Sequence, residues 1–269
     1  EINEKDLKIS VTHLKDGKIS EKITKKRGKL FYKLNNNTEF VKEEFFNKNE
    51  NLEASRTYDD TDKEIWTIFK NKKTIFKLEE NHTDGSIKLV ENYLPHNEKG
   101  YYEINLDQRI FVIKITNNVI NSILIKPKTE YAYATIKNYN NGIRNGLSFL
   151  ISEDKFLDKN LYIAYVYENG KQLFKYNCMP DLVFETPIEN NKEHGFQYHF
   201  KSGRGDYSLY GKNCYVKDVK VKEEHQNRYE ICKENKLNRK FYRNKYFNNR
   251  YPNVLHRSYF DILNAYLKN

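Results

Sequence analysis

The feature that most constrains the fold is the spacing of Asn-Gly and Asp-Gly pairs between short apolar runs. The pairs stand at 16–17, 84–85, 141–142, 145–146 and 169–170. A two-residue hairpin turn of type I′ needs positive φ at both central residues, and these pairs adopt it readily. Between them, runs such as RIFVIKI and KISVT alternate apolar and polar residues, which is typical of strands. The pattern predicts consecutive antiparallel hairpins up to about residue 221 and no helix before residue 222.

Within residues 137–220 the turn glycines recur at nearly constant intervals. Gly146 precedes Gly170 by 24 positions, and Gly170 precedes Gly195 by 25. Such spacing indicates a repeat with one hairpin in each unit. We expect Gly142 and Gly146 to supply positive φ to turns, because glycine adopts that conformation without a steric cost.

The segments YNNGIRNGLSFLI, YENGKQLFKY and KEHGFQYHFKSG resemble the degenerate MORN-type repeats of bacterial proteins, in which Tyr-x-Asn-Gly units recur. The resemblance is clearest over residues 137–220. It implies an elongated, single-layer sheet of antiparallel β-hairpins. It also implies a role in the cell envelope, in host interaction or in toxin neutralisation, where a toxin would be blocked by occupation of its surface.

We therefore expect a mainly β protein with three regions. Residues 1–130 are predicted to form an irregular β-hairpin region, residues 131–222 the MORN-like hairpin repeats, and residues 223–269 a basic, aromatic tail. The tail is predicted to be helical because apolar and aromatic residues recur at i, i+4, as in Leu237–Phe241 and Ile262–Tyr266. A terminal helix would cap the open edge of the hairpin array.

Positive charge is concentrated in this tail. The formal net charge is +10, and residues 228–269 hold ten Lys or Arg against three acids. The candidate contacts to nucleic acid or to another anionic partner are Arg239, Lys240, Arg243, Lys245 and Arg250, interleaved with Tyr242 and Tyr246. Basic groups neutralise phosphates while aromatic rings stack on bases. The alternative is that the rings dock a helix onto the sheet while the charges face water. Lysine-rich codon usage from an AT-rich bacterial genome is another source of the total charge.

No motif predicts catalysis, a cofactor or a metal site. The patterns GxSxG, HExxH, P-loop and GxGxxG are absent. His194 and His199 lie five residues apart, which places them on opposite faces of a strand, so we expect ordinary surface histidines. Asp59, Asp60 and Asp62 cluster without the glycine and glutamate of an EF-hand loop, and this indicates a solvated turn.

Three further features leave alternatives open. Cys178, Cys214 and Cys232 have no metal-binding spacing, so they predict either one disulfide with a spare thiol or three thiols. The tripeptide at 204–206, Arg-Gly-Asp, is interpreted as part of a turn and not as an adhesive motif. No apolar run reaches the length of about 20 residues that spans a bilayer. An exported or cell-envelope protein is favoured over a cytoplasmic one.

The sequence favours a non-catalytic binding or scaffold protein that engages a protein partner through its hairpin surface. The first alternative is a nucleic-acid-binding protein that acts through the tail. The second is an enzyme whose site is assembled from dispersed residues, with a pocket near His194 and Tyr198. No cofactor is expected, and the sequence does not name the partner or the oligomeric state.

Overall fold

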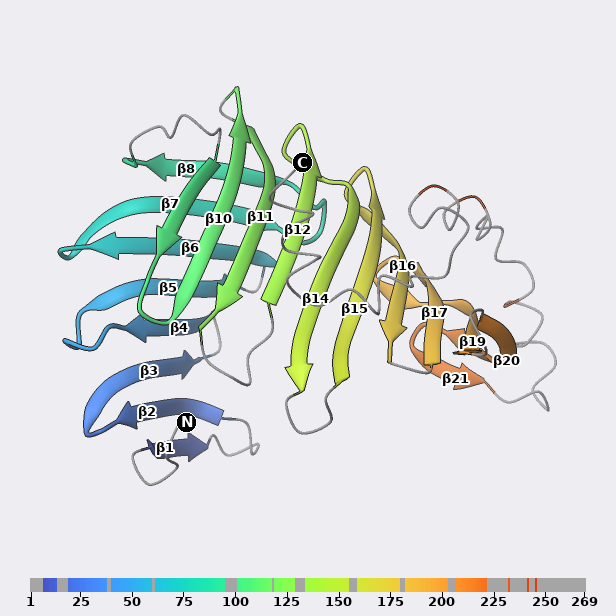
Figure 1. The fold of residues 1–269 in the computed structure, drawn as a ribbon, viewed down its shortest axis with the longest axis horizontal. Coiled ribbons are helices and arrows are strands. Elements are labelled where there is room, and N and C mark those ends of the chain that lie inside the picture. Colours follow the sequence, from blue (N-terminus) through green and yellow to red (C-terminus); the bar gives the residue numbers. More distant parts are fainter. Residues whose placement is uncertain are drawn as a thin grey trace. The chain divides into compact units, whose positions relative to one another are not determined.

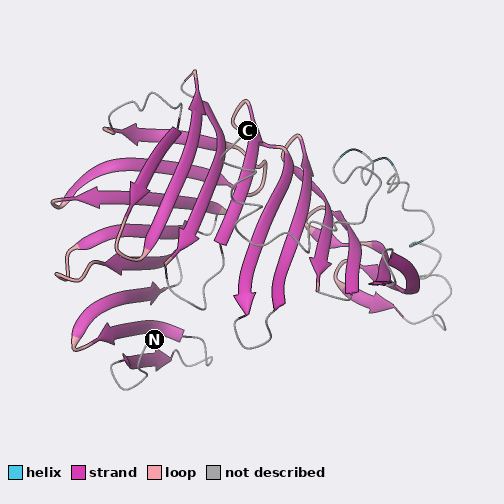
Figure 2. Ribbon diagram, viewed as in Figure 1, coloured by secondary structure: helices cyan, strands magenta, loops and turns pink. Residues whose placement is uncertain are grey.

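A computed structural model describes residues 7–13, 19–37, 40–59, 61–94, 101–117, 119–128, 134–154, 159–179, 182–202 and 207–221, and after them Cys232, Phe241 and Lys245. The described residues form 21 strands, and Cys232, Phe241 and Lys245 are single helical positions that form no element (Figure 1; Figure 2). Neighbouring strands pair antiparallel, mostly as consecutive hairpins. The prediction of a mainly β, hairpin-rich fold is therefore confirmed. The predicted helical tail, residues 223–269, lies outside the described residues except at those three positions.

The chain divides into two compact units. Unit 1 comprises Glu1–Thr129 and Tyr139–Ile143, and unit 2 comprises Glu130–Asn138 and Arg144–Asn269. Unit 1 contains an eight-stranded sheet in sequence order: β1 (Leu7–His13), β2 (Ile19–Lys26), β3 (Lys29–Asn36), β4 (Phe40–Phe46), β5 (Leu52–Asp59), β6 (Lys63–Lys70), β7 (Lys73–Asn81) and β8 (Ile87–Asn92). It also contains β9 (Tyr101–Asn105), β10 (Arg109–Thr116) and β11 (Val119–Pro127), which pair in that order.

In unit 1, β9 to β11 pack against strands β4 to β8 of the eight-stranded sheet (Figure 1). Trp66 of β6 lies edge-on to Phe111 of β10, with ring centroids 5.2 Å apart. The side-chain amide of Gln108 donates to the backbone carbonyls of Phe31 and Phe46, at 2.6 and 2.7 Å. Unit 1 thus has two sheets around one core, and not the single layer that the resemblance implied.

The second layer covers apolar residues of β10. Phe111, Val112 and Ile113 are consecutive, and all three are buried. Adjacent residues of a strand point to opposite faces, so each face of β10 needs a cover. Phe111 and Ile113 share the face that packs in the core with the eight-stranded sheet, and a single-layer sheet would leave that face exposed to water.

Four hairpins of the described residues repeat one geometry, in which a tight turn with positive φ is followed by a β-bulge on the second strand. The turns are at 27–28, 71–72, after Thr116 and at 169–170. Two of them, at 27–28 and 169–170, contain glycine. Asn71, Lys72 and Asn117 adopt positive φ elsewhere. Asparagine tolerates this conformation, so the hairpins continue through unit 1 without the glycine signal.

The strands that lie wholly or partly in unit 2 are β12 (Ala134–Asn140), β13 (Ile143–Arg144), β14 (Gly146–Asp154), β15 (Lys159–Glu168), β16 (Lys171–Cys178), β17 (Leu182–Glu189), β18 (Lys192–Glu193), β19 (Gly195–Ser202), β20 (Tyr207–Val216) and β21 (Val219–Val221). One device occurs twice among them. After β12 and after β17 the chain makes a two-residue turn, forms a two-residue strand, and enters a long strand at a glycine with positive φ. Those glycines are Gly146 and Gly195. Each predicted interval holds one hairpin of long strands, β14–β15, β16–β17 and β19–β20, as expected. Gly170 lies in an ordinary hairpin turn, so the turn device itself recurs only at every second hairpin.

The predicted type I′ turns are confirmed at 141–142 and 169–170, where both residues have positive φ. At 84–85 and 145–146 only the glycine does, so these pairs do not form that turn. The pair at 16–17 lies outside the described residues. Within the part of the chain described, no helix has the length and apolar character that a membrane span requires.

Candidate functional site

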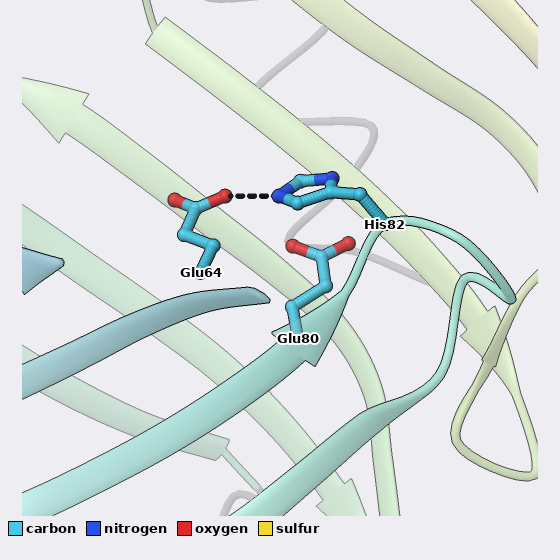
Figure 3. A group of neighbouring side chains, drawn as sticks. All are labelled: Glu64, Glu80 and His82. Carbon is cyan, nitrogen blue, oxygen red and sulfur yellow. Dashed lines mark hydrogen bonds and ion pairs between the residues drawn. The ribbon is translucent and has the colours of Figure 1, made fainter. Parts of the chain in front are cut away.

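Two buried carboxylates and a histidine meet in unit 1 beside the turn after β7 (Figure 3). Glu64 of β6 and Glu80 of β7 are direct cross-strand partners. Each is 1% exposed, whereas the side chain of His82, in the turn, is 35% exposed. One ligand atom from each of the three lies within 4.8 Å of the others. We call these three residues the Glu–Glu–His trio.

The alternation of the strands brings the two acids into the core. Trp66 follows Glu64, and Leu78 precedes Glu80, at the two-residue spacing that places side chains on one face. Trp66 and Leu78 are each 2% exposed. No sequence motif predicted either glutamate as a site residue. The signal that could have identified them is their position in the strand. Each glutamate lies two residues from an apolar residue of its own strand and therefore shares the buried face of that residue.

Glu64 is held by donors from three directions. The indole N–H of Trp66 and the Nε of Arg56 both donate to its Oε1, at 2.6 and 2.7 Å. The Nε2 of His82 lies 3.0 Å from its Oε2. The Arg56 guanidinium also lies 4.3 Å above the ring of Tyr58. Because Arg56 offsets the charge of the carboxylate, Glu64 is tolerated at this depth.

Glu80 and His82 are positioned from other parts of unit 1. The hydroxyl of Tyr139 donates to Glu80 Oε1 at 3.0 Å. The backbone N–H of His82 donates to the carbonyl of Asp62 at 2.9 Å, which fixes the turn beside the start of β6. The imidazole stacks on Tyr58, with ring centroids 6.5 Å apart. One oxygen of each carboxylate is thus held by a donor from outside the trio.

A polar path leads from the trio across the inner face of the eight-stranded sheet. The second nitrogen of Arg56 lies 3.3 Å from Glu43 Oε2, and the hydroxyl of Tyr32 donates to Glu43 Oε1 at 2.8 Å. Burial, followed by the nearby Glu43 charge, raises the pKa of Tyr32 well above its ordinary value of 10.0. Burial also lowers the pKa of Arg109, whose guanidinium lies 4.2 Å from the Phe45 ring. At one end of this path, the Glu–Glu–His trio brings an imidazole nitrogen and carboxylate oxygens together, and such groups bind a cation or a proton.

The two histidines considered from the sequence do not meet. His194 precedes β19, and its Nε2 lies 3.4 Å from Glu189 Oε2. His199, on β19, lies 3.0 Å from Gln197 Oε1 and 3.0 Å from Asn213 Nδ2. Partial burial lowers the pKa of His199.

The aspartate cluster forms a local turn. Oδ1 of Asp59 accepts the backbone N–H groups of Thr61 and Lys63, each at 3.0 Å. Asp60 lies outside the described residues, as do the three residues of the Arg-Gly-Asp tripeptide.

The predicted tail contacts are mostly beyond what the structure describes. Lys245 is described, with its Nζ 3.2 Å from Glu168 Oε1 and 5.7 Å from the centre of the Phe241 ring. The other candidates lie outside the described residues: Arg239, Lys240, Arg243, Arg250, Tyr242 and Tyr246. At the one position that can be compared, the positive charge contacts unit 2 itself.

Cys214 of β20 and Cys232 form a disulfide, which is one of the two alternatives left open by the sequence. Cys232 is 2% exposed and packs in a small cluster with Phe196 and Val221. The bond therefore fastens the chain beyond β21 to unit 2.

The second candidate site is the outer edge of β20 in unit 2. One edge of β20 pairs with β19 along its length, whereas the other pairs with β21 only at 214–216. No strand among the described residues pairs with the outer edge at 207–213, which we call the open edge. A bulge sets Leu209 and Tyr210 against a single β19 residue, Phe200, and leaves them 58% and 73% exposed.

No known protein family matches this sequence, and a search of curated proteins finds no match either. A functional conclusion therefore rests on the geometry of the Glu–Glu–His trio and of the open edge.

Proposed function

We propose that the protein is a non-catalytic binding protein that engages a protein partner through the hairpin sheet of unit 2. The observation that carries this proposal is the open edge of β20. A strand edge offers a row of backbone donors and acceptors, and an extended segment of another protein adds to it as a further strand. The template for such a segment is the part of β20 that β21 does not cover, residues 207–213.

The side chains around the open edge favour a partner segment that is both apolar and acidic. Leu209 and Tyr210 supply exposed apolar surface. Lys201, Lys212 and Lys220, on the last three strands, are also exposed. Complementary charge speeds the encounter of two surfaces and selects between partners.

In this proposal unit 2 is a MORN-like hairpin array, and residues 223–269 form a helical cap at the end of β20 that pairs with β21, which leaves 207–213 open to the partner. The recurring turn device, with Gly146 and Gly195 in equivalent places, supports the first part. The disulfide from Cys214 to Cys232, which brings the start of the tail to β20, supports the second. Roles in the cell envelope, in host interaction or in toxin neutralisation all fit a protein that acts by occupying a surface.

The test is capture of partners by the full chain and by a variant of the open edge that combines Leu209→Asp with Tyr210→Ser. The matched control is Tyr93→Ser, because Tyr93 is 70% exposed but lies in unit 1. We expect a protein that is captured by the unaltered chain and by the control and is lost with the edge variant.

Two results would contradict the proposal. The first is a protein captured equally by all three chains. The second is salt-sensitive capture of nucleic acid that is lost when Arg239, Lys240 and Arg243 are changed to glutamine, because that result moves the function to the tail.

A further inference from the structure

We infer that the Glu–Glu–His trio of unit 1 is a binding site for a divalent transition-metal ion such as Zn²⁺. An imidazole nitrogen together with carboxylate oxygens is a donor set that zinc accepts. This inference concerns a different unit from the open edge and is independent of the proposed binding function.

The distances suit adjacent ligands of one ion. Ligands about 2.1 Å from a tetrahedral zinc ion lie about 3.4 Å apart, so two groups in hydrogen-bond contact need to part only slightly to share one ion. The Oε2 of Glu64 and the Nε2 of His82 are 3.0 Å apart. All three ligand atoms lie within 4.8 Å of one another, so a small rotation of the Glu80 side chain brings its carboxylate to the same ion.

The contacts behind the carboxylates resemble the outer shell of a metal site. Ligating carboxylates are usually held by further hydrogen bonds that fix their orientation. Here Trp66 and Arg56 donate to one oxygen of Glu64, and Tyr139 donates to one oxygen of Glu80. The positive charge of Arg56 opposes a second cation, so the expected affinity is modest.

The exposure of the three side chains indicates how an ion reaches the site, and their positions indicate what the bound ion does. Glu64 and Glu80 are 1% exposed, while the side chain of His82 is 35% exposed and lies in a turn. An ion therefore enters from the side of His82 (Figure 3). Once bound, it reduces the repulsion between the two carboxylates and ties the turn after β7 to β6. A ligand that binds only the folded chain raises its melting temperature.

The test is titration of the full chain with Zn²⁺ alone, followed by calorimetry and by tryptophan fluorescence. Trp66 is the chain's single tryptophan, and its indole donates to Glu64, so it reports on this site. We expect one Zn²⁺ per chain, a change in Trp66 emission and a raised melting temperature. Glu80→Gln and His82→Gln each lower the affinity at least about tenfold.

The matched control is Glu79→Gln, which removes a carboxylate next to Glu80 that is paired with Lys63. The control keeps the affinity of the unaltered chain. The inference is overturned if Zn²⁺ binding does not saturate, or if His82→Gln binds as tightly as the control. His82 lies in a turn and not in the core, so this variant decides the matter even if Glu80→Gln fails to fold.

Discussion

Gly28 and Gly142 occupy the same position in the same kind of turn but differ in their surroundings. Their φ angles are 78° and 73°, and each is the second residue of a two-residue turn. A Cβ added to Gly28 meets nothing within 4 Å, whereas one added to Gly142 lies 3.2 Å from the backbone oxygen of Ile87. We therefore predict that alanine destabilises unit 1 more at position 142 than at position 28.

The two losses can be estimated from the structure. Both variants place alanine in the left-handed region, which costs about 1–2 kcal/mol. At Gly142 the methyl group also presses on Ile87, whose N–H donates to the Gly142 carbonyl at 2.7 Å. Disturbing that hydrogen bond costs about 1 kcal/mol more. Gly28→Ala should thus lower the free energy of unfolding by about 1–2 kcal/mol, and Gly142→Ala by about 2–3 kcal/mol.

Urea unfolding followed by Trp66 fluorescence measures the difference, because Trp66 and both glycines belong to unit 1. Asparagine tolerates positive φ but still has a Cβ. Gly142→Asn should therefore retain only the loss of about 1 kcal/mol that comes from Ile87. Equal losses for the two alanine variants, or full stability for Gly142→Asn, would refute the reasoning.

Three further predictions follow from other contacts. Lys72→Gly should raise the free energy of unfolding by about 0.5–1 kcal/mol, because Lys72 has a φ of 64°. The gain is measured as a higher urea midpoint, and an unchanged midpoint counts against strain in this turn. Reducing the Cys214–Cys232 bond, which closes a loop with a sequence separation of 18, should lower the free energy of unfolding by about 3 kcal/mol in circular dichroism; identical melting with and without reductant contradicts this. Because burial lowers the pKa of His199 from 6.5, the unfolded chain binds its proton first, and stability should fall as the pH drops below 6.5. His199→Gln should reduce this slope in urea midpoints measured between about pH 5 and pH 7, and an unchanged slope rules out His199 as its source.

The hairpins of this chain could be predicted where the turn chemistry is explicit. The pairs at 141–142 and 169–170 form the expected turns because asparagine and glycine adopt positive φ cheaply. The turn at 71–72 gave no such signal, since lysine adopts positive φ only when the pairing of the flanking strands imposes it. The second layer of unit 1 was missed because the single layer implied by the resemblance was extended to the whole chain. The alternation in RIFVIKI indicates one buried face, and Phe111 and Ile113 of that face are fully covered.

The Glu–Glu–His trio could be predicted only in part. Glu64 and Glu80 each lie two residues from an apolar residue of the same strand, and this spacing places each acid on the inner face of its strand. Whether the two acids meet depends on the register of β6 and β7, and a shift by one residue would turn one of them outward. Tyr139 reaches Glu80 from a distant part of the sequence, and no local pattern encodes that contact.

Amide hydrogen exchange of the full chain, with and without a captured partner, tests the proposed binding role most directly. If the partner adds a strand to the open edge, exchange should slow at residues 207–213 of β20, where backbone groups gain hydrogen bonds. Protection confined to other strands, with exchange at 207–213 unchanged, would contradict the proposal.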